Sequence, residues 1–178
     1  LITDHLGEVF NQLAPGFSEV ERNRLALAMT PLFPGVVAIN FVVMTAVNTV
    51  IAQGILVRIR YNKRPSPSYV NFKLPVWSSW PLVSAAFLAL VGTGEWEYMG
   101  RNLAMVLAIP YFFLGLSVFH YLARRVVTTM PLLVALYLVI IISMWAALVV
   151  AGVGIVEQWF GLRNRFTNTP ASSDKKNI

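Results

Sequence analysis

The chain has 178 residues, of which 57% are hydrophobic and only 12% are charged. A water-soluble domain carries about 25% charged residues, so this composition excludes an ordinary soluble domain and favours a polytopic membrane protein. The net charge of +6 does not indicate nucleic-acid binding, because the basic residues stand beside the ends of apolar runs, where they contact lipid headgroups and set topology. The absence of cysteine excludes disulfides, thiolate catalysis and cysteine-based metal sites.

Residues 1–30 are predicted to form short amphipathic helices at the membrane surface. The first helix, over 2–13, places its apolar residues on one stripe and ends at a Pro-Gly pair. It either lies in the membrane interface or packs on protein, and its acidic polar face favours protein. The second helix begins at Ser18, with Glu21 three residues later, which is the pattern of a capping box.

The first membrane helix is predicted over 32–57, a run of 26 residues without a charge. At 1.5 Å per residue it is about 39 Å long, against a hydrocarbon core of about 30 Å, so it must tilt or protrude. It carries three amide side chains, Asn40, Asn48 and Gln53. Amides in hydrocarbon need hydrogen-bond partners. Interhelical hydrogen bonding is the simpler interpretation, and a ligand-lining face is the alternative.

The middle of the chain, 57–81, is rich in basic residues and prolines. A second apolar run, 76–92, opens with Trp77 and Trp80, which suit an aromatic belt. Its 17 residues reach only about 25 Å, so it either just spans the bilayer or forms a re-entrant element. The residues 93–102 that follow are predicted to be a solvated loop.

Two more membrane helices are predicted, over 103–122 and 131–156. His120 stands at the end of the first, beside two arginines, which is typical of a residue at headgroup level. A proton relay through it requires an acidic partner that the neighbouring sequence lacks. Glu157 follows the second helix at the membrane interface, where it pairs with Arg163 or with a basic residue elsewhere.

The predicted fold is therefore an all-α transmembrane bundle of about four membrane helices, over 31–166, followed by a disordered polar tail, 167–178. With four spans, each side of the membrane carries seven basic residues. If 76–92 is re-entrant, the split becomes ten to four. The dense basic cluster in 57–81 favours placing that stretch in the cytoplasm, with the tail on the opposite side.

Four stretches of the chain carry a family resemblance: the helix opening PLFPG, the segment FKLPVWSSW, the run NLAMVLAIPYFFLGLSVFHYLARR and the closing GIVEQWFGLRNRF. Together they resemble the YybS-like family of bacterial integral membrane proteins of unknown function. The likeness is to the C-terminal half of these proteins and reaches about Phe166, so it implies a missing N-terminal set of membrane helices. It assigns no catalytic or binding residues. A likeness to the substrate-binding subunits of energy-coupling-factor vitamin transporters is an analogy at fold level.

The sequence holds no glycine-rich nucleotide loop, no catalytic triad set and no metal-ligand cluster. We therefore predict a protein that is not an enzyme and that has no cofactor, in a bacterial inner membrane, with the lipid bilayer and other membrane subunits as partners. The candidate functional residues are the polar contacts Asn40, Asn48, Gln53, His120 and Glu157.

Two functions fit this pattern. The first is a structural or accessory subunit of a membrane protein assembly. The alternative is part of a small-molecule binding or transport unit. A cavity bordered by Asn48 and Gln53 would favour transport, whereas amides buried against neighbouring helices would favour a scaffold.

Overall fold

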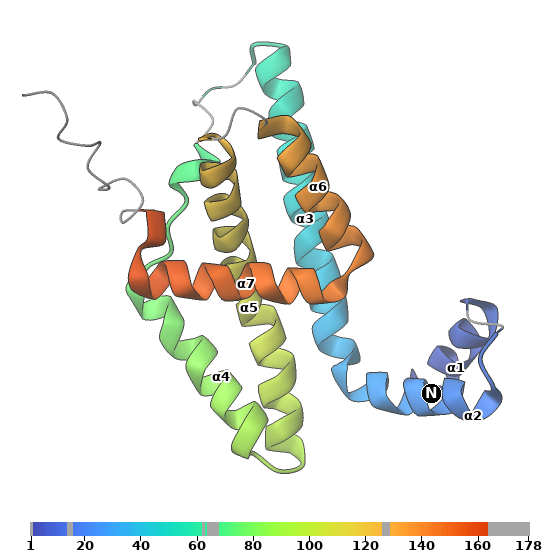
Figure 1. Ribbon diagram of the computed structural model, residues 1–178. Helices are drawn as coiled ribbons and strands as arrows, with labels where there is room; N and C mark the ends of the chain where they lie inside the picture. The colour runs from blue at the N-terminus through green and yellow to red at the C-terminus, as the bar shows by residue number, and fades with distance from the viewer. Residues whose placement is uncertain (1, 14–15, 62, 64–67, 126–128, 164–178) are drawn as a thin grey trace, which may run out of the picture. The chain divides into compact units, whose positions relative to one another are not determined.

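The computed structural model describes residues 2–13, 16–61, 63, 68–125 and 129–163, and these residues form helices and connections without a strand. The prediction of an all-α fold is confirmed. The longer helices (Figure 1) are α1 (Ile2–Leu13), α2 (Glu19–Met29), α3 (Phe33–Arg58), α4 (Ser79–Val91), α5 (Glu95–Ala123), α6 (Thr129–Ile142) and α7 (Met144–Phe160). Short 3₁₀ turns are η1 (Thr30–Leu32), η2 (Tyr69–Asn71) and η3 (Val76–Ser78). The predicted tail, 167–178, lies outside the described residues.

The chain divides into two compact units, which are described separately. Unit 1 comprises Leu1–Arg64 and Ser79–Leu107, and unit 2 comprises Pro65–Ser78 and Ala108–Ile178. Helix α5 gives its first part to unit 1 and its second part to unit 2. Pro110 lies close to this division, inside α5. Because proline has no backbone N–H, one intrahelical hydrogen bond of α5 cannot form there.

The N-terminal helices of unit 1 pack on each other. The predicted capping box is present, because the Ser18 hydroxyl accepts from the Glu21 N–H at 3.3 Å and the Glu21 carboxylate accepts from the Ser18 N–H at 2.9 Å. Helix α1 contacts α2, and the Thr30 hydroxyl lies 3.3 Å from that of Thr3. The apolar stripe predicted on α1 therefore belongs to a helix with a partner inside the chain.

Helices α4 and α5 form a tight hairpin in unit 1. The predicted loop over 93–102 is wrong, because α5 already begins at Glu95 and the connection from α4 is only Gly92–Gly94. Gly94 supplies the turn with φ +60°. The acidic residues in the first turn of α5 favour helix because they complement its dipole, and Glu97 forms an ion pair with Arg101 one turn on. A Cβ at Gly100 would lie 2.4 Å from the Ala89 nitrogen, so the two helices touch through their backbones.

The core of unit 2 lies where α7 crosses the second part of α5 (Figure 1). A Cβ at Gly115 would lie 1.8 Å from the Val150 carbonyl oxygen, and one at Gly154 would lie 1.9 Å from that of Tyr111. Two glycines therefore allow the helix backbones to meet directly. Tyr111, Leu114, Val118 and Val150 are buried around this crossing.

The helix predicted over 131–156 is interrupted. Ser143 is extended, with φ −123° and ψ 111°, and it separates α6 from α7. The helix direction bends by 119° between them. The run before Ser143 is rich in β-branched residues, which lower helix propensity, and serine favours helix ends over helix interiors. These local preferences are invisible to a hydropathy count.

The structure tests the predicted number of membrane helices only in part. Within the described residues, two helical stretches are long and apolar enough to cross a bilayer, Glu19–Arg58 and Glu95–Ala123. The bent pair α6 and α7 makes a third if it counts as one broken span, and Val76–Val91 is a shorter apolar helix. About four membrane helices are therefore not confirmed.

Candidate functional site: polar contacts of the apolar helices

A buried ion pair closes the C-terminal end of α7. The chain reverses at Gly161, which has φ 59° and donates its N–H to the Glu157 carbonyl at 2.9 Å. This reversal brings Arg163 back over the last turn of the helix. Its Nε donates to the Glu157 carboxylate at 2.7 Å and its backbone N–H donates to the same carboxylate at 3.1 Å. Both residues are buried, at 7% and 9% exposure.

The guanidinium of Arg163 also holds a distant segment of unit 2. Its Nη1 donates to the Val70 carbonyl at 2.6 Å and its Nη2 donates to the Phe72 carbonyl at 2.9 Å. The Gln158 amide donates to the Leu74 and Pro75 carbonyls at 3.3 and 3.1 Å. We call Tyr69–Pro75 the strap, and Glu157, Gln158 and Arg163 the C-terminal clamp. The clamp supplies donors to strap carbonyls, while Glu157 balances the charge of the arginine.

A histidine lies between two tyrosines beside the strap. The His120 ring stands edge-on to Tyr69 and to Tyr137, with ring centroids 5.5 and 6.0 Å apart. His120 Nδ1 lies 2.9 Å from the Leu116 carbonyl, and Nε2 makes a long contact of 3.5 Å with the Tyr137 hydroxyl. A neutral ring protonated on Nδ1 satisfies both contacts, as donor on one side and acceptor on the other.

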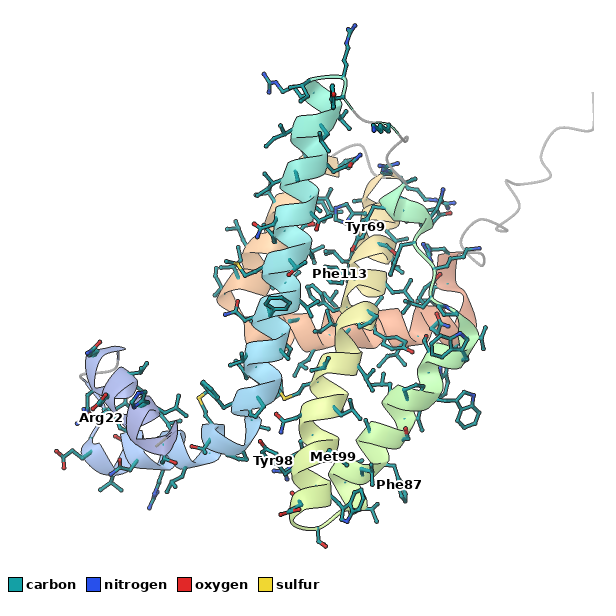
Figure 2. All side chains as sticks on the ribbon, turned by 180° about the vertical axis from the view of Figure 1, so that it is seen from behind. Arg22, Tyr69, Phe87, Tyr98, Met99 and Phe113 are labelled. Atoms are coloured by element: carbon teal, nitrogen blue, oxygen red, sulfur yellow. The ribbon has the colours of Figure 1, made fainter. Side chains whose placement is uncertain are left out.

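Tyr69 attaches the strap to α5. Its hydroxyl donates to the Phe113 carbonyl at 2.7 Å, and Figure 2 shows the two labelled residues side by side. Burial raises the pKa of the Tyr69 phenol, and the nearby Tyr137 adds to the rise. The hydroxyl therefore stays protonated at physiological pH and remains a donor.

In unit 1, Asn102 of α5 bridges the start of α3. Its Oδ1 accepts from the Gly35 N–H at 2.7 Å, and its Nδ2 donates to the Pro31 carbonyl at 2.8 Å. Those two backbone groups, four residues apart, are the pair that would bond to each other in a regular α-helix. The side-chain amide is therefore inserted into the backbone ladder where η1 passes into α3. A Cβ at Gly35 would lie 2.9 Å from Asn102 Oδ1, so glycine gives the amide its access.

The predicted residues fall into two groups. Asn40 and Asn48 are exposed on α3 in unit 1, and Gln53 is half-buried on the same helix and has an interaction partner. In unit 2, His120 packs between Tyr69 and Tyr137, whereas Glu157 belongs to the C-terminal clamp. The structure does not bring His120 and Glu157 into one site. Of the two partners weighed for Glu157, the structure has Arg163.

Sequence reasoning missed several contacts that involve backbone carbonyls. Asn102 was assigned to a loop, and neither Tyr69 nor Gln158 was singled out. Their partners are backbone groups far away in the sequence, and no sequence motif identifies such pairs. One available signal was the helix start that the prolines at 31 and 34 mark, because the first N–H groups of a helix have no partner within it.

The chemistry of these contacts is that of structural hydrogen bonding. Arg163, Gln158 and Asn102 all donate to backbone carbonyls, and the clamp leaves its carboxylate bound to its own arginine. In the part of the chain that the structure describes, no three histidine or acidic side chains gather in a way that would hold a metal ion. We therefore regard these residues as contacts that order the helices.

Long apolar helices tied together by such isolated polar contacts define an α-helical membrane protein. The chain belongs to the DUF2232 family, described as predicted membrane proteins, whose sequence model matches residues 13–157. No curated protein and no solved structure matches the chain.

Proposed function

We propose that the chain is a structural or accessory subunit of a membrane protein assembly. The observation that supports this most is the pair of exposed amides on α3. Asn40 and Asn48 are exposed on a helix whose most apolar part is only 6% buried. Lipid tails offer an amide no hydrogen bond, so a partner protein at this helix stabilises the chain in the bilayer.

The two threonines next to these amides on α3 differ from them in their hydrogen bonding. The Thr45 hydroxyl donates to the Phe41 carbonyl at 2.8 Å and the Thr49 hydroxyl donates to the Thr45 carbonyl at 2.7 Å. Both hydroxyls are therefore satisfied within their own helix. Among the described residues, no such bond is formed by Asn40 or Asn48. The need for an outside partner rests with the two amides.

The proposal includes finer points that rest on sequence alone. They are the likeness to the C-terminal half of YybS-like proteins, a bacterial inner membrane location with several membrane passes, and the absence of enzymatic activity. The alternative of a small-molecule binding or transport unit needs a cavity bordered by Asn48 and Gln53. Asn40 and Asn48 are exposed on a largely uncovered helix, so the burial against neighbouring helices of the chain that was expected of a scaffold is not found for these two amides. The subunit proposal therefore requires that their partner come from another protein.

The test replaces Asn48 by leucine and Thr49 by valine, each in the full chain in its native membrane. Proteins that co-purify with the chain in mild detergent are quantified. We expect Asn48→Leu to reduce the recovery of a membrane partner, which is another copy of the chain or a different protein. Thr49→Val removes a hydroxyl that is bonded within α3, so it should leave recovery unchanged. Equal recovery with all three chains would refute the proposal, and loss of solute uptake by Asn48→Leu with unchanged recovery would favour the transport alternative.

A further inference from the structure

One side of α3 carries residues at the spacing of a coiled-coil seam. Phe41, Met44, Asn48, Ile51 and Ile55 follow one another at intervals of three, four, three and four. We call these five residues the heptad stripe, because such intervals put them at the a and d positions of a heptad. The four apolar members are between 55% and 73% exposed, and Asn48 is exposed as well. Within unit 1, the whole stripe is therefore uncovered.

The stripe contains a single polar residue, close to the middle of α3. With Phe41 at an a position, Asn48 is the next a position, and it is flanked on the stripe by Met44 and Ile51. A single asparagine at an a position fixes the register of paired helices and favours two-stranded association. In a bilayer, where lipid tails cannot bond an amide, its hydrogen bond also stabilises the pair. The stripe thus combines apolar packing with one residue that discriminates between partners.

The chemistry of the amide points to the occupant. An amide has both donors and acceptors, so two copies of Asn48 facing each other satisfy each other reciprocally. A parallel two-fold axis along the membrane normal places every residue of α3 opposite itself at the same depth. A different protein would need a polar group at that same depth, whereas a second copy supplies it automatically.

We propose that the chain forms a parallel two-fold dimer through the heptad stripe of α3, with Asn48 hydrogen-bonded to Asn48 of a second copy. This proposal rests on the proposed function, because it names the partner of the exposed amide. Asn40 lies one position before Phe41, at a g position beside the seam. It flanks the interface and does not form its centre.

The first experiment is cross-linking of single-cysteine variants, which the chain allows because it has no cysteine of its own. Met44→Cys and Ile51→Cys, in the full chain in native membranes, should each cross-link to the same position of a second copy under mild oxidation. Val50→Cys is the matched control, because Val50 is 71% exposed but lies about 200° around the helix from Asn48. It should cross-link at least tenfold less. Equal cross-linking at Val50, or none at either stripe position, would overturn the proposal.

Orientation is tested by mixing the two stripe variants. Met44 and Ile51 lie on either side of Asn48, so an antiparallel pair would join one Met44→Cys chain to one Ile51→Cys chain. A parallel pair joins only like positions. A predominance of mixed cross-links would overturn the parallel arrangement.

The role of the amide is tested by dimer dissociation on lipid dilution, followed by energy transfer between labelled copies in vesicles. Interhelical hydrogen bonds in membranes stabilise by amounts that correspond to about threefold to thirtyfold in association. Asn48→Leu should weaken the dimer by that factor, and Thr49→Val should not. Unchanged association of Asn48→Leu would contradict the proposal.

The outcomes separate this inference from the proposed function. If no cross-links form between copies but Asn48→Leu still removes a different co-purifying membrane protein, the dimer is refuted and the subunit proposal stands. If Asn48→Leu changes neither, both are refuted.

Discussion

The buried ion pair of the C-terminal clamp leads to a prediction for Glu157→Gln. The substitution keeps the size of the side chain and removes its charge, which leaves the Arg163 guanidinium without its counter-charge. Glu157 is 7% exposed and Arg163 is 9% exposed. Breaking a buried pair from one side costs about 3–5 kcal/mol, because the remaining charge is uncompensated. Glutamine can still accept a hydrogen bond, so we expect the lower end, about 3 kcal/mol.

The opposite substitution, Arg163→Met, should cost more. It leaves the Glu157 carboxylate buried and also removes the donors to the Val70 and Phe72 carbonyls. We expect a loss at the upper end, about 4–5 kcal/mol. The double variant Glu157→Leu with Arg163→Met should be destabilised less than Arg163→Met alone, because it leaves no buried charge.

The free energy of unfolding is measured for each purified chain by titration with a denaturing detergent, followed by helical circular dichroism. Arg163→Lys is the matched control for geometry. It keeps the charge but loses the planar fork that reaches three partners at once, so it should fall between the unmodified chain and Arg163→Met. A change below about 1 kcal/mol for Glu157→Gln, which is the value of a solvent-exposed pair, would refute burial of the clamp.

Three further predictions concern packing, backbone bonding and topology. Gly154→Val should lower the free energy of unfolding by about 3 kcal/mol, because it forces the crossing helices apart. Gly152→Ala meets nothing within 4 Å and should change it by less than about 1 kcal/mol. Equal effects in a thermal melt would contradict the crossing. Asn102→Leu should cost about 1–3 kcal/mol, because the Gly35 N–H and Pro31 carbonyl lose their partner, and an unchanged melting temperature would refute the bridge. Thr93→Cys should be labelled by an impermeant maleimide from outside the cell if α4 crosses the membrane with the basic stretch 57–81 in the cytoplasm. Labelling only after lysis would refute this combination of a crossing α4 and a cytoplasmic 57–81.

The class of the fold was accessible from sequence because hydropathy and charge act over many residues at once. The long uncharged run over 32–57 predicts a helix there, and α3 covers Phe33–Arg58. The Ser18 and Glu21 capping box was also predictable, because both partners lie within one turn. Sequence patterns that span one turn, or that repeat along a helix, can be recognised without knowledge of the tertiary structure.

The remaining features depend on contacts between distant residues or on small local differences. The helix breaks at Ser143, although neither proline nor glycine stands at that position. Asn102 acts on backbone groups 67 and 71 residues away in sequence. Of the predicted polar contacts, the ion pair of Glu157 was the most accessible, because its partner Arg163 follows only six residues later.

The clamp also constrains the order in which unit 2 is completed. Arg163 donates to the Val70 carbonyl, 93 residues earlier in the chain, so the strap has to wait for its donors until α7 and the turn at Gly161 have been synthesised. Until then the Val70 and Phe72 carbonyls lack the donors that Arg163 supplies. A ribosome stalled before Arg163 should therefore hold a chain whose strap is still cleaved by protease, and release of the last turn should protect it. The pair that closes α7 therefore couples the ordering of the strap to the synthesis of α7.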